Sequence, residues 1–423
     1  MSAPPATSPS LVLAHPTLAE RKHTWTLTQP EWGTALTLEE YLHREEYLTT
    51  VPLAKHGGVT HWILTVASAP PDQRPILSSC ETLRKRALYS TTAPPGGGGV
   101  AEGIAHGVGS VFTDPAYRGK GYASRMLTMV ADELKAHQGT LMSPSATAAS
   151  SAADDKRLPP VAFSFLFSDI GKKFYASRGW VPHPSSHLSF TTLPSRRSST
   201  ASSDAAAAAP PPVAAIGYHE LAELCTRDES LLRDRMSRLP SSLEAHQAPS
   251  SFASTPPDAS RPLTYVALAP DLDTMLWHLM REDFITTRLF GTTPSVRGAV
   301  FGHPGRRVWA VWTRTYQAAP PAISANTLYI LRLVVEDESA GEEYLAEGLR
   351  AVIDLAREEA AEWGTAKVLL WNPDGEVEGL MRRSGLTFEA VEREKDSILS
   401  LMWYGDGPGE NVVWVAGEKY TWC

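Results

Sequence analysis

Residues 108–123 read Val-Gly-Ser-Val-Phe-Thr-Asp-Pro-Ala-Tyr-Arg-Gly-Lys-Gly-Tyr-Ala, and they predict a strand, a turn and the start of a helix. The apolar run 108–113 is typical of a strand, and the Asp114-Pro115 pair that follows it is a turn signal. Apolar residues then recur at i, i+3, i+4, i+7, i+8 and i+11 of a helix, namely Ala123, Met126, Leu127, Val130, Ala131 and Leu134.

The turn between this strand and helix is suited to hold a pyrophosphate. Gly119 and Gly121 allow the backbone close to a ligand, and Arg118 and Lys120 add positive charge. The free N–H groups of the first helical turn and the helix dipole add positive potential at the same place. The spacing matches neither the Gly-x-Gly-x-x-Gly dinucleotide fingerprint nor a Walker A loop. We therefore predict a phosphate cradle here, with an ordinary βα turn as the alternative.

The composition of the chain indicates a globular protein and argues against several classes of partner. A chain of 423 residues, with 43% hydrophobic and 20% charged residues, points to about two or three globular domains. The net charge of −8 argues against nucleic acid or an anionic membrane as the main partner. No apolar run reaches the roughly 20 residues of a membrane span, and residues 1–10 lack the basic start of a secretory signal. Cys80, Cys225 and Cys423 are too few for a disulfide framework or a zinc site, so we expect a reduced, cytoplasmic location and no metal.

The first half of the chain predicts a mixed α/β domain over residues 1–193. Thr17 with Glu20 forms a capping-box pattern at the start of a helical region that extends to about residue 48. Strands are expected at 11–14, 61–66, 76–88, 100–113 and 161–167, then a short helix at 170–177 and extended chain to 193. The Ser/Ala-rich residues 139–160 are expected to be a disordered insertion.

The tract Arg118-x-x-Gly121-x-Ala123 resembles the Gln/Arg-x-x-Gly-x-Gly/Ala signature of the GNAT family of acetyl-CoA-dependent N-acetyltransferases, and the order of predicted elements resembles its domain. The resemblance implies an α+β fold in which the cradle strand and the next strand splay apart, so that the pantetheine arm lies in the gap. It implies acetyl-CoA as the acetyl donor, without a metal. The residues implied to bind the coenzyme are Val111, Phe112, Thr113, Arg118, Gly119, Lys120, Gly121, Tyr122 and Ala123.

After a Ser/Ala/Pro-rich linker at 194–213, residues 214–423 repeat this order in outline. Helices are expected at 221–239 and 272–283, strands at 308–315 and 328–336, then a helix, a strand at 368–371 and a short helix at 377–384. The turn at 337–341 is Asp-Glu-Ser-Ala-Gly, and its acidic residues would repel phosphate. We therefore predict a degenerate second GNAT-like lobe that contributes to the substrate cleft without binding coenzyme. An unrelated α+β domain is the alternative.

Amine acetylation needs a base for the substrate ammonium and an acid for the departing thiolate. The tract 174–180, Phe-Tyr-Ala-Ser-Arg-Gly-Trp, resembles a GNAT tract whose tyrosine lies near the coenzyme sulfur, which makes Tyr175 the candidate acid. Candidate bases are Glu102 and His106, four apart on one strand face, and Glu81 in a polar cluster. A water-mediated base, or the C-terminal carboxylate of Cys423, are alternatives.

A narrower resemblance lies in tracts 14–21, 41–46, 79–82, 168–175, 283–291 and 309–314, which are similar to the fungal lysine N6-acetyltransferases of lysine catabolism. This likeness implies direct acetyl transfer to the ε-amine of free L-lysine in a ternary complex. A carboxylate clamp is then needed, for which Arg84, Arg288 and Arg314 are candidates, with Asp283 for the α-ammonium. A polyamine or protein lysine as acceptor, or a non-catalytic acetyl-CoA-binding regulator, are the alternatives.

Overall fold

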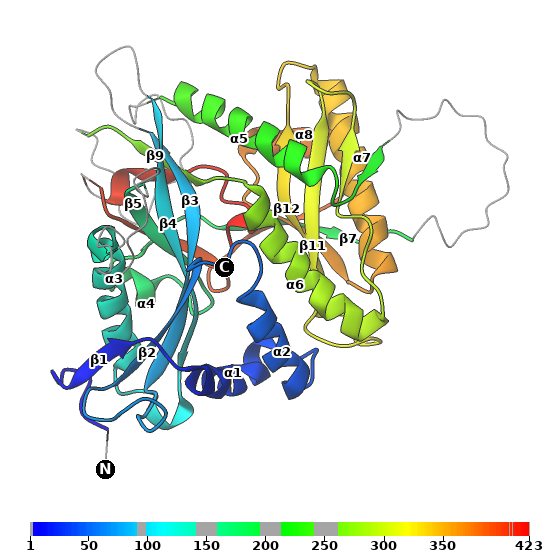
Figure 1. Cartoon of the computed structure of the whole chain (residues 1–423). Coiled ribbons are helices and arrows are strands. Elements are labelled where there is room, and N and C mark those ends of the chain that lie inside the picture. Colours follow the sequence, from blue (N-terminus) through cyan, green and yellow to red (C-terminus); the bar gives the residue numbers. More distant parts are fainter. Residues whose placement is uncertain are drawn as a thin grey trace, which may run out of the picture.

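The structure is a computed structural model that describes residues 3–90, 99–140, 159–194, 213–240, 261–405, 407 and 409–422. The predicted insertion at 139–160 and the predicted linker at 194–213 fall almost entirely outside these residues. Two sheets with flanking helices form the molecule, as expected of a mixed α/β fold (Figure 1). Among the described residues, no helix is long and apolar enough to cross a membrane.

The first sheet is built mainly from the N-terminal half. Its antiparallel part comprises β1 (Leu11–Ala14), β2 (Val59–Val66), β3 (Ser78–Ser90) and β4 (Val100–Thr113), and β5 (Val161–Ser168) runs parallel to β4. The helices of this half are α1 (Leu18–Trp32), α2 (Leu38–Leu48), α3 (Tyr122–Thr140) and α4 (Lys173–Ala176). The predicted capping box of Thr17 and Glu20 is present at α1, and Thr37 with Glu40 forms a second one at α2. Buried apolar residues of α3, among them Met126, Leu127 and Val130, pack on the sheet as their spacing predicts.

The second sheet repeats this plan. It contains β8 (Ala214–Ile216), β10 (Gly298–Phe301), β11 (Val308–Thr315), β12 (Thr327–Val335) and β13 (Lys367–Trp371), the last parallel to β12. Its helices are α5 (Leu221–Arg238), α6 (Leu272–Phe290), α7 (Glu342–Glu362) and α8 (Gly375–Arg383). The acidic turn 337–341 joins β12 to α7, in the place that the cradle occupies between β4 and α3. The helix α6 runs seven residues beyond its predicted end because apolar residues such as Ile285 remain buried and Gly291 ends the helix with φ of +71°.

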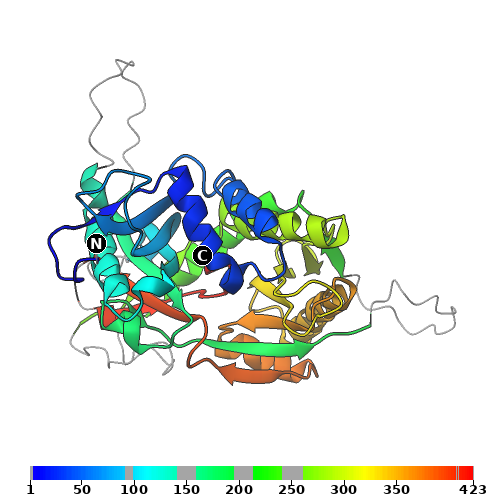
Figure 2. The same cartoon turned by 90° about the horizontal axis from the view of Figure 1, so that it is seen from below.

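Each sheet also takes strands from the other half of the chain. The strand β7 (Ser186–Thr191) lies between β13 and β14 (Glu389–Glu392), and β15 (Ile398–Trp403) lies between β5 and β6 (Val181–Pro182). In addition, β9 (Thr264–Leu268) pairs with β3 and with β16 (Val412–Trp414). Figure 2 shows the green β7 running alongside the orange strands of the second sheet. The predicted boundaries at 193 and 214 therefore do not separate the two sheets, although the stretch between them connects the two halves in sequence.

Candidate active site

The predicted cradle is a left-handed turn at the start of α3. After β4, Asp114 caps a 3-10 turn (Pro115–Tyr117), and the chain then enters α3 through Gly119 and Gly121, whose φ angles are +76° and +84°. A Cβ at Gly119 would meet no atom within 4 Å, so this glycine is required by its backbone conformation and the space beside it is open, whereas Ala6 lies beside Gly121.

Basic side chains surround this turn. The Arg118 guanidinium lies 5.1 Å from the centre of the Phe112 ring and donates to the Thr113 carbonyl at 3.2 Å. Lys120 and Arg125 lie on either side of Gly121, and in the described part of the chain neither these two nor Arg118 forms an ion pair. Unneutralised cations beside the first turn of a helix fit a bound phosphate group. Tyr122 and Phe112 have buried side chains, so they are positioned to contribute backbone groups.

The strands β4 and β5 diverge beside the cradle. Their parallel pairing extends from Ile104 with Val161 to Gly107 with Phe165 and is not continued by the described residues further along β4. Near the same place Ser110 has φ of +52° and the pairing of β3 with β4 shifts between Ser79 and Glu81, which marks a bulge. The segment 108–113 thus presents backbone groups to a gap, as the resemblance implied.

This gap opens into a cavity of about 520 Å³ between the two halves of the chain. Its walls come from α2, β3, β4 and β5 on one side and from α6 and the C-terminal segment on the other. The charged and polar residues that line it include Arg44, Glu45, His61, Glu81, Ser110, Asp169, Tyr175, Arg281, Asp396 and Lys419.

Glu81 is a carboxylate of this cavity that could accept a proton near neutral pH. Its carboxylate accepts a hydrogen bond from Ser110 Oγ at 2.7 Å, and its side chain is only 19% exposed. Burial, reinforced by the charge of Glu45, raises the pKa of Glu81 to about 7, against the opposing hydrogen bond from Ser110. His61 Nε2 lies 3.5 Å from the carboxylate, but burial lowers the pKa of His61 to about 4, so the imidazole is neutral. A carboxylate that titrates near neutrality is suited to general base catalysis.

Tyr175 lines the same cavity, where its hydroxyl could donate a proton. The residue is buried on α4, and this burial raises the pKa of its phenol. The hydroxyl therefore stays protonated at neutral pH. The structure brings the predicted acid and one of the predicted bases into one cavity.

The other two predicted bases lie elsewhere. Glu102 points toward α5, where it pairs with Arg86 at 2.8 Å and Arg233 at 2.9 Å, and the hydrogen bond from Arg86 lowers its pKa. His106 is buried in the sheet, opposite Arg84 of β3, and neither residue lines the cavity. The alternation of a strand predicts one face for Glu102 and His106, but neither residue lines the cavity, and Glu102 pairs with Arg233 of α5 instead. Glu102, His106 and Arg84 are thus not positioned for the roles that we predicted.

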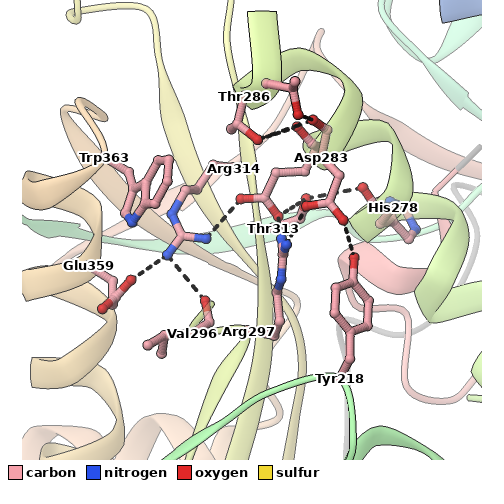
Figure 3. Close-up of polar contacts among 12 residues, drawn as sticks. Tyr218, His278, Asp283, Thr286, Val296, Arg297, Thr313, Arg314, Glu359 and Trp363 are labelled. Atoms are coloured by element: carbon pink, nitrogen blue, oxygen red, sulfur yellow. Dashed lines mark hydrogen bonds and ion pairs between the residues drawn. The ribbon is translucent and has the colours of Figure 1, made fainter. Parts of the chain in front are cut away.

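The remaining predicted clamp residues are also outside the cavity. Arg314 is fully buried and pairs with Glu282 at 2.8 Å and Glu359 at 2.7 Å (Figure 3). Asp283 accepts a hydrogen bond from Tyr218 and pairs with Arg297 (Figure 3), and Arg288 lies exposed over the Phe284 ring. Because Arg314 and Asp283 are occupied by internal ion pairs, they hold α6 against β11 and α7 instead of binding substrate.

Sequence reasoning missed several residues that line the cavity. Arg281 on α6, His61 on β2 and Trp422 near the C-terminus come from segments far apart in sequence, and no motif joins them. One signal was available: Arg44 and Glu45 lie in the tract 41–46 that carried the narrower resemblance.

Comparisons with known proteins identify the family of the chain. A family model described as "LYC1 GNAT-like C-terminal domain" matches residues 193–423, more than half of the chain, and the model of the acetyltransferase (GNAT) family matches residues 91–151. Among curated proteins, a "Lysine acetyltransferase" of Yarrowia lipolytica (strain CLIB 122 / E 150) is 27% identical over 382 residues, which cover 88% of this chain and 87% of that protein.

Solved structures show weaker likeness. A probable N-acyltransferase from Enterococcus faecalis V583 matches with a TM-score of 0.47 and 11% identity, over 92% of this chain and 71% of that one. A GCN5-related N-acetyltransferase from Kribbella flavida matches with a TM-score of 0.45 and 13% identity, over 92% and 70% of the two chains. These scores are too low to carry an argument, so the assignment depends on the family models. The chain belongs to the family defined by the LYC1 GNAT-like C-terminal domain and is an acetyltransferase of the GNAT type.

Proposed function

We propose that this enzyme acetylates the ε-amine of free L-lysine with acetyl-CoA, by direct transfer in a ternary complex, and so serves lysine degradation. The observation that carries the proposal is that Glu81, with its pKa near 7, and the Tyr175 hydroxyl line one cavity at the gap between β4 and β5. The curated relative from Yarrowia lipolytica, named as a lysine acetyltransferase, supports lysine as the acceptor.

The residues of the cradle fit acetyl-CoA, which supplies the acetyl group when it is bound. The N–H groups of the turn from Gly119 to Ala123, with Arg118, Lys120 and Arg125 beside them, would hold the pyrophosphate. The unpaired edge of β4 at 111–113 would hold the pantetheine arm.

Glu81 and Tyr175 have complementary roles in the proposed reaction. The ε-ammonium of lysine has a pKa of about 10.4 in water, so a proton must be removed before the amine attacks. Glu81 accepts this proton, and Ser110 fixes the carboxylate by its hydrogen bond. Tyr175 donates its proton to the departing thiolate. Burial raises the pKa of the Cys80 thiol, and Cys80 does not line the cavity, which favours direct transfer over an acetylated cysteine.

The lining of the cavity supports a small, cationic amine as acceptor. A volume of about 520 Å³ lies in the range of sites for small molecules. Trp277, Trp422 and Leu83 offer apolar contacts for an aliphatic stem, and Glu81, Asp169 and Asp396 add acidic groups.

Thiol release from acetyl-CoA tests the proposal, with L-lysine, Nα-acetyl-lysine, L-ornithine, spermidine and a lysine-containing peptide as acceptors. We expect turnover with free L-lysine to exceed that with every other acceptor. Preferred turnover with the peptide or with spermidine would contradict lysine as the substrate and leave the acetyltransferase assignment intact. Tight coenzyme binding without any turnover would favour a regulator.

A further inference from the structure

Arg281 is a cation in the cavity that the mechanism above does not use. It lies on α6, one turn after Trp277, and its guanidinium is 6.0 Å from the centre of the Trp422 ring. Throughout the described part of the chain it forms no ion pair or hydrogen bond with a side chain or a carbonyl. Burial, together with the positive charge of Arg44, lowers the pKa of Arg281 to about 10, so it is charged at neutral pH.

The sequence of α6 explains why Arg281 has no acidic partner on its own helix. On a helix, an acidic residue pairs with an arginine when it lies three or four positions away. None of the residues at these positions around Arg281 is acidic: they are Trp277, His278, Phe284 and Ile285. The two acids that follow it directly, Glu282 and Asp283, are taken up by Arg297 and Arg314 in the buried network of Figure 3. Arg281 is partly buried, and the charge of Glu45, which is itself paired with Arg44, only partly opposes the lowering of its pKa. Partial burial of a cation without an ion-pair partner costs free energy, which a bound anion would offset.

The other cations of the cavity are already engaged. Arg44 donates to the Glu45 carboxylate at 2.8 Å and to the Trp32 carbonyl at 3.3 Å. The Lys419 ammonium lies over three rings, at 3.9 Å from that of Trp422, 4.2 Å from that of Trp371 and 4.6 Å from that of Tyr329. Arg281 is therefore the cation among the described lining residues that is best able to accept an anionic group from a ligand.

We propose that Arg281 binds the α-carboxylate of the acceptor and makes this enzyme select a free amino acid over a diamine or a peptide lysine. The inference rests on the proposed function. A planar guanidinium binds a carboxylate through two parallel hydrogen bonds, which neither lysine nor a neutral residue reproduces. The arginine comes from α6 and the base Glu81 from β3, so the carboxylate end and the amine end of the acceptor meet opposite walls of the cavity.

The test compares L-lysine with cadaverine, which has the same stem and amine but no carboxylate, in the parent enzyme and in Arg281→Met. We expect kcat/KM for L-lysine to fall about 10- to 100-fold, mostly through KM, while the value for cadaverine stays within about threefold. L-Norleucine has the carboxylate but no ε-amine, so it should inhibit cadaverine acetylation in the parent enzyme and do so 10- to 100-fold less well in Arg281→Met. Arg281→Lys keeps the positive charge but not the planar guanidinium, so its kcat/KM for L-lysine should lie between those of the parent enzyme and Arg281→Met.

The matched control is Arg350→Met on the exposed face of α7, which should leave kcat/KM unchanged for both L-lysine and cadaverine. Thermal unfolding and coenzyme affinity establish that each variant is folded, and Arg281→Lys carries the same comparison if Arg281→Met does not fold. Equal losses with L-lysine and cadaverine, or an unchanged KM for L-lysine, overturn the inference while leaving the proposed function intact. A parent enzyme that acetylates neither acceptor overturns the proposed function, and the inference falls with it.

Discussion

Replacing Glu81 with glutamine should separate the catalytic role of this residue from its effect on stability. The amide keeps the shape of the side chain and an oxygen that can accept the hydrogen bond from Ser110, but it cannot take a proton from the substrate. General bases typically contribute about 10²- to 10⁴-fold to the rate, so we expect kcat to fall by that factor. Coenzyme affinity should stay near that of the parent, because Glu81 lies away from the cradle.

The same substitution should stabilise the folded protein at alkaline pH. Folding raises the pKa of Glu81 from 4.5 to about 7, so the folded state holds the proton more tightly than the unfolded state. Stability due to this group is therefore greatest below pH 4.5, declines as the pH rises toward 7, and stays reduced above that. At about 1.4 kcal/mol for each pKa unit, the ionised carboxylate costs up to about 3 kcal/mol at pH 8, and glutamine avoids this cost.

Two measurements check this prediction. Urea unfolding of the parent and of Glu81→Gln should differ at pH 8, and the difference should vanish near pH 4.5. Initial rates of thiol release should rise with pH through about 7 in the parent, with roughly a tenth of the plateau value at pH 6. The reasoning is refuted if Glu81→Gln keeps its rate within a few-fold, or if its stability gain is the same at both pH values.

Three further substitutions test other parts of the site. Tyr175→Phe should lower kcat by about 10²-fold or more with near-normal coenzyme affinity, and an unchanged rate would remove Tyr175 from the mechanism. Arg118→Glu should weaken coenzyme binding measured by calorimetry, and unaltered affinity would falsify the pyrophosphate assignment. Arg314→Met removes the buried cation that joins Glu282 to Glu359, while Arg297 still pairs with Glu282, so urea unfolding should show a loss of about 3 kcal/mol, whereas the folded fraction should keep the KM of the parent. A raised KM with normal stability would instead restore Arg314 as a substrate clamp.

Elements whose sequence signals span only a few residues could be predicted from the sequence. The cradle, the helix that follows it and the capping box at Thr17 depend on glycine conformation, apolar periodicity and side-chain bonds over three residues. The bounds of β1 and β4 match their predicted ranges for the same reason, since each strand is delimited by turn residues.

The pairing of strands was not predictable in this way. The strands β7 and β15 have ordinary apolar patterns, and nothing in those patterns states that each joins the sheet of the other half. A strand satisfies its backbone hydrogen bonds against any edge with the right register, so the choice of partner is made by packing over the whole chain. The short β9 and β10 were not predicted either, and they pair with β3 and β11.

The chemistry of the site divides along the same line. Residues 108–123 determine, through short-range geometry, a basic glycine turn at the start of α3, and the tract 174–180 places Tyr175 on the short helix α4. Which carboxylate is the base, and which arginine faces the acceptor, depends on burial and on counterions contributed from distant segments. Glu81 and Glu102 are the same side chain in adjacent strands, yet one is buried in a cavity and the other is neutralised by Arg86 and Arg233. Likewise, Arg314 is fully buried and pairs with Glu282 and Glu359, whereas Arg281 is partly buried and forms no ion pair with a described residue, although the charge of Glu45 acts on it.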